Sequence, residues 1–169
     1  RDRSPSRGLG DVYKRQLQDS AATEALGRLL GKHAASGDVF CLSGDLGAGK
    51  TLLSRGVAVA LGAAAEDVNS PTFAIMNVYQ GRELEIRHFD LYRLNRPEEL
   101  EDIGFEEYAR GDGVTLIEWA ELFKEELPEE YLQITLLHDG EGRRAVLQAQ
   151  GERYEKLLRE VEKDADFGN

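Results

Sequence analysis

The sequence predicts an α/β fold with a mixed sheet, because strand-like and helix-like segments alternate along the chain. Two observations support this prediction. Short apolar runs typical of strands buried on both faces occur at 39–42 and 114–117. Paired strand-like segments joined by glycine-containing turns, within 73–89 and 132–147, indicate two antiparallel hairpins.

The first half of the chain begins with a helix over 20–33, where apolar side chains recur every three or four residues. Asp19 or Ser20 can cap its first turn. A buried strand at 39–42, a glycine-rich turn and a second helix over 50–61 follow directly. The order strand, glycine loop, helix is therefore expected in this half.

The second half continues the alternation of strands and helices. We expect strands at 73–79 and 84–89, a short helix opening at Pro97, a strand at 114–117, strands at 132–136 and 145–147, and an amphipathic helix at 152–163.

Length and composition narrow the class of protein. The chain has 169 residues, which suits one domain, and 41% apolar residues, which is enough to bury a core. No apolar run approaches the ~18 residues that span a bilayer, so an integral membrane protein is excluded. A net charge of −11 disfavours tight direct binding to nucleic acid. The single cysteine, Cys41, permits no intrachain disulfide and fits a reducing cytoplasm.

The two ends of the chain are expected to lie outside the fold. Residues 1–16 have no amphipathic period and no signal-peptide core, and they resemble an appended leader, either non-native or disordered. Residues 17–163 are expected to form one domain, and residues 164–169 a disordered tail.

One glycine-rich segment carries the strongest chemical signal. Residues 44–51, GDLGAGKT, fit the P-loop pattern G-x-x-x-x-G-K-[ST] between a predicted strand and a predicted helix. Glycines let backbone N–H groups turn toward a phosphate, and the helix N-terminus adds partial positive charge. We expect Lys50 to reach the β- and γ-phosphates and Thr51 to bind Mg²⁺. This predicts a P-loop NTPase-like three-layer domain with a mixed, mostly parallel sheet.

Two acidic residues that follow predicted strands are candidates to hold Mg²⁺ or its waters. Asp90 follows the strand at 84–89 and Glu118 the strand at 114–117. Ligands of open α/β sheets bind beyond the carboxyl ends of the strands, where both acids would point. The alternative for either acid is a solvated loop position. The loop at 70–72 either senses the γ-phosphate or is a plain proline turn.

Four other residues have simpler interpretations. Cys41 and His33 are expected to be core residues, because each lies in an apolar pattern. His88 shares a strand face with Asp90, so it either orders the site or is a hydrogen-bonded structural histidine. Trp119 is either a core aromatic or a wall of the nucleotide site.

Four motifs occur in series: GDLGAGKT at 44–51, SPTF at 70–73, HFDLYRL at 88–94 and IEW at 117–119. In this order and approximate spacing they closely resemble the TsaE (YjeE) family, bacterial ATPases required to form threonylcarbamoyl-adenosine in tRNA. The resemblance runs from about Ser20 to about Gly151. The P-loop alone would be unspecific, but the four motifs together are highly specific.

The resemblance implies roles for individual residues. Glu118 matches the family's acid in the second nucleotide-site motif and is the better Mg²⁺ candidate, while Asp90 would assist hydrolysis or metal placement. The implied catalytic residues are Lys50, Asp90 and Glu118, and the implied metal ligands are Thr51, Asp90 and Glu118. The residues implied to bind ATP are Asp45, Leu46, Gly47, Ala48, Gly49, Lys50, Thr51, Leu52, Thr23, Thr72 and Arg143.

The resemblance also implies a function and partners. The chain would be a Mg²⁺-dependent ATPase that works with the TsaD–TsaB pair, and hydrolysis would reset that complex without making the threonylcarbamoyl group. The partners would hold the tRNA, which agrees with the acidic character of this chain. Basal turnover is expected to be slow, because no arginine finger is evident in the sequence.

Three alternatives share the P-loop. A small-molecule or nucleotide kinase would need an acceptor pocket and an arginine-bearing lid, for which 169 residues leave little room. A small GTPase would carry Asn-Lys-x-Asp, and no asparagine in this chain is followed by lysine. A nucleotide-gated binding module would hydrolyse ATP very slowly even with its partner present.

Overall fold

The computed structural model describes residues 12–45, 47, 49–68 and 75–168, with side chains described as far as Ala165. Its strands form one seven-stranded sheet in the order β1-β7-β6-β2-β5-β4-β3. The strands are β1 (Val12–Leu17), β2 (Val39–Gly44), β3 (Met76–Gln80), β4 (Glu85–Asp90), β5 (Val114–Glu118), β6 (Tyr131–Asp139) and β7 (Gly142–Gln150). The helices are α2 (Ser20–His33), α3 (Lys50–Ala60), α4 (Glu98–Asp102), α5 (Phe105–Ala109) and α6 (Glu152–Gly168), with 3₁₀ segments η1 (Ala65–Asp67) and η2 (Ala120–Glu126).

The sheet is parallel in its centre and antiparallel at its flanks. Strands β6, β2, β5 and β4 run parallel, while β1–β7, β6–β7 and β3–β4 are antiparallel pairs. The chain therefore has the mixed sheet that its hairpins and buried runs predicted. Parallel neighbours bring the carboxyl ends of β2, β5 and β4 to the same edge.

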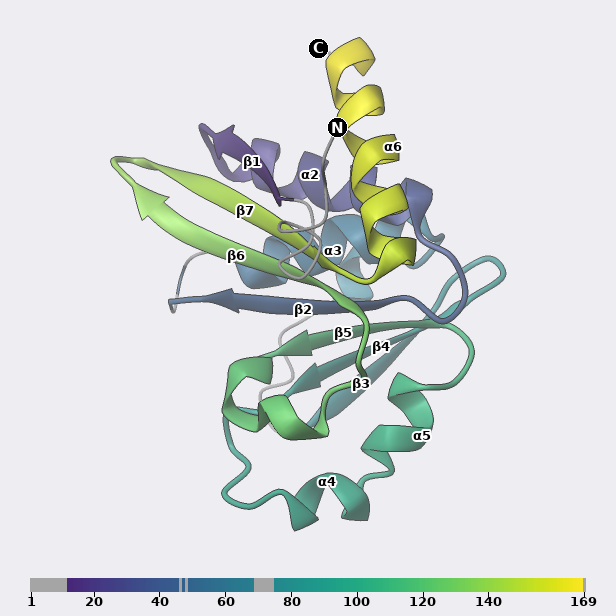
Figure 1. Ribbon diagram of the computed structural model, residues 1–169. Coiled ribbons are helices and arrows are strands. Elements are labelled where there is room, and N and C mark those ends of the chain that lie inside the picture. Colours follow the sequence, from purple (N-terminus) through teal and green to yellow (C-terminus); the bar gives the residue numbers. More distant parts are fainter. Residues whose placement is uncertain (1–11, 46, 48, 69–74, 169) are drawn as a thin grey trace.

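Helices cover both faces of the sheet, which gives three layers (Figure 1). One core joins α2, α3 and α6 to the sheet, and the other joins α4, α5 and η2 to the opposite face. Strand β2 contributes to both, because Phe40 and Leu42 face the first core while Val39 and Cys41 face the second. This is why its sequence is an unbroken apolar run. Cys41 is fully buried, as its core assignment predicted.

Helices α2 and α3 approach each other at glycines. A Cβ built on Gly27 would lie 2.2 Å from the Leu53 carbonyl oxygen, and one on Gly56 would lie 2.2 Å from the Glu24 carbonyl oxygen. A Cβ on Gly31 would lie 2.5 Å from the Val57 carbonyl oxygen. The backbones are therefore in direct contact. This contact joins the helix that follows the P-loop to the helix that precedes β2.

The prediction that residues 1–16 lie outside the fold is wrong for residues 12–16. They belong to β1, which pairs with β7 in register from Val12 opposite Gln148 to Leu17 opposite Arg143. The side chains of Tyr13 and Leu17 pack into the first core. An edge strand of this kind is stabilised by its partner strand, so its own sequence pattern is weak.

The predicted boundary of the C-terminal tail is also wrong, because α6 continues to Gly168. Asp164 accepts a hydrogen bond from His33 at 2.9 Å and pairs with Lys32 at 2.9 Å. His33 therefore joins α2 to α6 as a half-buried polar residue, not as the core residue that its apolar neighbours suggested. Helix α5 and the segment η2 were not predicted.

Within the part of the chain that the structure describes, no helix combines the length and apolar character needed to cross a bilayer.

Candidate functional site

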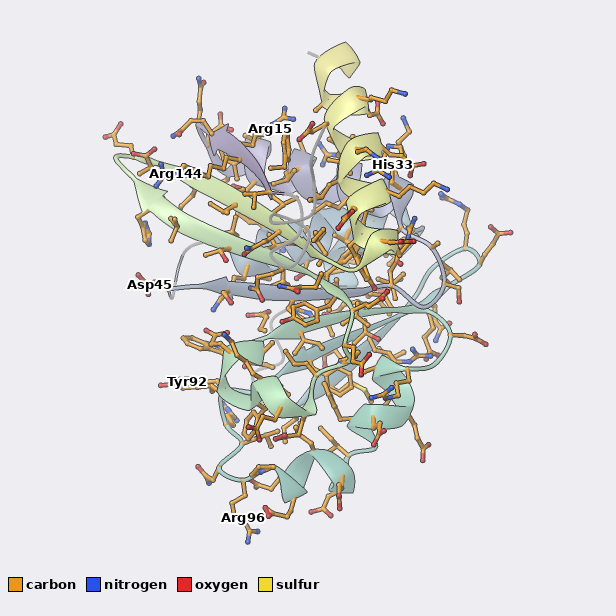
Figure 2. All side chains as sticks on the ribbon, viewed as in Figure 1. Arg15, His33, Asp45, Tyr92, Arg96 and Arg144 are labelled. Atoms are coloured by element: carbon orange, nitrogen blue, oxygen red, sulfur yellow. The ribbon has the colours of Figure 1, made fainter. Side chains whose placement is uncertain are left out.

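The P-loop lies where β2 passes into α3. Gly47 has φ = 79° and Gly49 has φ = 106°, both in the left-handed region that favours glycine. Gly49 immediately precedes Lys50, the first residue of α3, so the loop ends at a helix N-terminus. Asp45 is exposed and its side chain extends away from the sheet edge (Figure 2). Leu46 and Ala48 lie outside the described residues, as does the whole SPTF motif with Thr72.

Lys50 is held by two contacts at the base of the loop. Its ammonium donates a hydrogen bond to the Gly44 carbonyl oxygen at 2.8 Å, and it lies 4.1 Å from the centroid of the Trp119 ring. The residue is only 6% exposed. The cation is thus anchored by a carbonyl and an aromatic face, which attract it by charge–dipole and cation–π interactions.

Trp119 has unusual backbone geometry. Its φ of 63° is the only positive value for a non-glycine residue in the described part of the chain. Such a conformation costs about 1–3 kcal/mol and persists only where the surroundings enforce it. The centroid of the exposed Tyr92 ring lies 4.9 Å from that of Trp119. Trp119 packs partly against the second core and also lines the hollow described next, so both positions predicted for it apply.

Asp90 and Glu118 end neighbouring parallel strands and are opposite each other in the register. Leu42 of β2 is paired with Glu118 on the other side, so Glu118 lies beside the strand that leads into the P-loop and Asp90 lies one strand further along the same edge. A hollow of about 290 Å³ gathers the predicted catalytic and metal residues; it is lined by Gly47, Gly49, Lys50, Thr51, Leu52, Asp90, Glu118 and Trp119.

The two carboxylates have different surroundings. Burial raises the pKa of Asp90, and the charge of Glu118 adds to this shift. The Tyr92 backbone N–H, which donates to Asp90 Oδ1 at 3.0 Å, opposes it, as do His88 and Lys50. Glu118 is 3% exposed, and its Oε2 lies 2.6 Å from His88 Nε2. Asp90 is thus partly open to the hollow, whereas Glu118 is held by a hydrogen bond from His88 in the neighbouring strand.

A second, smaller hollow adjoins the other side of the P-loop. Its volume is about 100 Å³, and its lining includes Thr23, Gly47, Gly49 and Arg143. Arg143 Nη2 donates to the Gly47 carbonyl oxygen at 3.0 Å. Thr23 Cγ2 would lie 3.2 Å from a Cβ on Gly49. Thr23 and Arg143, which come from distant parts of the sequence, therefore both lie against the P-loop.

Sequence reasoning missed two aromatic residues of the site. Tyr92 falls within the HFDLYRL motif and Tyr79 within a predicted strand, and neither pattern predicts a role in the site. Tyr79 donates or accepts a hydrogen bond at His88 Nδ1 over 3.0 Å, behind Glu118. No local pattern could have indicated this contact, because it joins two strands through side chains.

Comparison with known proteins identifies the family. The family model described as "Threonylcarbamoyl adenosine biosynthesis protein TsaE" matches residues 17–146. This chain belongs to the TsaE family. The matched range contains all four motifs and every predicted site residue, so the hollow between the P-loop, Asp90 and Glu118 is the candidate site of a TsaE-family protein.

Relatives of this TsaE-family chain are similar over nearly their whole length. The tRNA threonylcarbamoyladenosine biosynthesis protein TsaE of Bacillus subtilis is 43% identical over 148 residues, covering 87% of this chain and 92% of the relative. The protein of the same name from Treponema pallidum is 41% identical over 132 residues, covering 78% and 94%. The crystal structure of Bacillus subtilis YdiB superposes with a TM-score of 0.79 at 35% identity, covering 93% of this chain and 98% of that chain.

Proposed function

We propose that this chain is a Mg²⁺-dependent ATPase that works with a TsaD–TsaB pair in the threonylcarbamoyl-adenosine modification of tRNA. One observation supports this most directly: a single hollow brings together Lys50, Thr51, Asp90 and Glu118 beside a glycine loop and a helix N-terminus. The names of the relatives support the pathway. A role in tRNA modification would place the protein in the cytoplasm.

The residues of the hollow fit a nucleotide and a magnesium ion. A Cβ on Gly47 would meet nothing within 4 Å, so the loop has open space on that side. The hydroxyl of Thr51 and the carboxylates of Asp90 and Glu118 are oxygen donors, the type that Mg²⁺ prefers. When bound, Mg²⁺ would neutralise charge on the phosphates.

The chain's own residues would divide the chemistry. Backbone N–H groups of the loop and the α3 N-terminus would bind the phosphates, and Lys50 would stabilise charge that develops on the γ-phosphate. Asp90, which is partly open to the hollow, would orient the attacking water. Glu118 would hold the metal or its waters. Thr23 and Arg143 would contact the nucleotide from the second hollow.

A partner would complete the site, because the larger hollow itself contains little positive charge. Lys50 is the only cation among its lining residues in the described part of the chain. Arginine fingers accelerate phosphoryl transfer by about 10³–10⁵-fold, so a site without one hydrolyses ATP slowly. Tyr92, 63% exposed beside Trp119, leaves the rim open to a partner. The tRNA would then contact the partners and not this acidic chain.

The test is ATP hydrolysis by the purified chain, alone and with a TsaD–TsaB pair, with and without Mg²⁺. We expect slow Mg²⁺-dependent release of phosphate that changes when the pair is added, together with co-elution of the three proteins. Turnover that ignores the pair, with phosphate appearing on an added small-molecule acceptor, would favour a kinase instead. Turnover that stays negligible with the pair would indicate a nucleotide-gated binding module.

Lys50→Ala tests the phosphate site itself. Loss of a charge-assisted contact costs about 1.5–3 kcal/mol, so calorimetric titration should show ATP affinity about 10- to 100-fold weaker. Lys156→Ala is the matched control, because Lys156 is an exposed lysine on α6 outside both hollows. Unchanged affinity in Lys50→Ala would contradict the assignment of the P-loop.

A further inference from the structure

His88 lies in a polar chain that leads from the interior of the sheet to the candidate site. Its side chain is fully buried. Nε2 lies 2.6 Å from Glu118 Oε2, and Nδ1 lies 3.0 Å from the Tyr79 hydroxyl. These three residues come from β3, β4 and β5, which are neighbours in the sheet. The chain therefore crosses three strands and ends at a carboxylate that lines the hollow.

Packing alone does not account for this arrangement. Burying an imidazole and a carboxylate costs free energy, and well-packed apolar residues of similar volume are often as stable or more so. On β4, Ile86 and Phe89 are apolar and face the two cores, while the buried Arg87 is paired with Glu85 and the Tyr108 carbonyl oxygen, away from the hollow. The polar side chains from Tyr79 through His88 instead end at Glu118, which lines the hollow, and this placement points to a role in the site.

Two hydrogen bonds hold the ring of His88 at its two nitrogens. At one end Nε2 can donate to the Glu118 carboxylate, which accepts. At the other end Nδ1 is within hydrogen-bond distance of the Tyr79 hydroxyl. Tyr79 thereby fixes the orientation of the ring, as outer partners of metal-site histidines do.

We propose that His88, oriented by Tyr79, is a positioning residue that holds Glu118 for its role in the nucleotide site. The hydrogen bond engages Oε2 of Glu118, a residue that lines the hollow. The inference deepens the proposed ATPase function and depends on it for its catalytic consequence. That His88 holds the Glu118 carboxylate in place does not depend on that function.

Two nearly isosteric variants separate positioning from packing. The amide nitrogen of glutamine extends to about where Nε2 of histidine lies, whereas that of asparagine reaches only the position of Nδ1. His88→Gln therefore keeps a donor for Glu118, and His88→Asn loses it. Outer-shell changes cost about 10- to 100-fold, so His88→Asn should lower kcat by that factor and raise the Mg²⁺ concentration for half-maximal rate. The KM for ATP should change little, and His88→Gln should recover most of kcat.

Crystal structures of the two variants give a readout that needs no activity. We expect the Glu118 carboxylate to leave its position in His88→Asn and to keep it in His88→Gln. Thermal unfolding of both variants verifies the fold. Tyr79→Phe should lower kcat in the same way as His88→Asn, but by a smaller factor.

An unmoved Glu118 in His88→Asn, or equal loss of kcat in both variants, would overturn the positioning role. If the wild-type chain hydrolyses no ATP with or without the TsaD–TsaB pair, the proposed function fails instead. The position of Glu118 in the two crystal structures still decides whether His88 holds the carboxylate.

Discussion

Replacing Gly56 by alanine tests the contact between α2 and α3. A Cβ at this position would lie 2.2 Å from the Glu24 carbonyl oxygen and 2.8 Å from the Arg28 backbone nitrogen. An ordinary carbon–oxygen contact is about 3.3 Å or longer, so the two helices would have to separate locally by about 1 Å. Both obstacles are backbone atoms, which cannot rotate away as a flexible side chain would.

The expected cost is the difference between two opposing effects. Alanine is favoured over glycine in a helix by about 1 kcal/mol. Overpacking in a core costs about 1–3 kcal/mol, and contact with backbone places Gly56→Ala at the upper end of that range. We expect a net loss of about 2 kcal/mol. For a domain of this size the loss corresponds to a fall in Tm of about 4–8 °C.

Urea unfolding followed by circular dichroism measures this change. Ala25→Gly is the control, because Ala25 lies on the exposed face of α2 and reports the propensity difference without the contact. It should lose about 1 kcal/mol. A Gly56→Ala protein as stable as the wild type, or more stable, would refute the argument that the two backbones touch.

Two further predictions concern ionisable groups. The pKa of Asp90 is raised, so its carboxyl group binds a proton more tightly in the folded state than in the unfolded state. The contribution of Asp90 to the free energy of unfolding therefore falls as the pH rises above 3.8. Asp90→Asn should therefore raise Tm at pH 7 but not near pH 3, while abolishing turnover; an equal Tm difference at both pH values would contradict this. Burial raises the pKa of the Cys41 thiol, so a disulfide reagent should react with it only after unfolding in urea. Prompt reaction in the native protein would show that this strand opens readily.

The sequence predicted those elements whose pattern is local. Helix α2 was recognisable from its apolar period, and Asp19 does accept a hydrogen bond from the Ala22 backbone N–H at 2.8 Å. Strands β2 and β5 were recognisable because both of their faces are buried. The carboxyl ends of these strands then placed Glu118 beside the P-loop without any knowledge of the full topology.

The remaining features depend on contacts between distant segments. In β1, Tyr13 and Leu17 face the core, but Arg15 lies between them on the same side and obscures the alternation. Strand β1 is held in the sheet by its pairing with β7. The chain from Tyr79 through His88 requires the strand order β3-β4-β5, which no single segment encodes. Thr23 and Arg143 are brought together by α2 and the β6–β7 hairpin.

The anchoring of Lys50 has a consequence for how tightly a nucleotide can bind. Its ammonium already has two partners, the Gly44 carbonyl and the Trp119 ring. In the proposed ATPase a phosphate would have to compete with them, so binding would be an exchange of contacts and not a simple gain. A cation–π contact is worth about 0.5–2 kcal/mol, and each 1.4 kcal/mol is a factor of about ten in affinity. In the proposed ATPase, the Trp119 ring would therefore assist the release of nucleotide, because Lys50 regains its cation–π contact when the phosphate leaves.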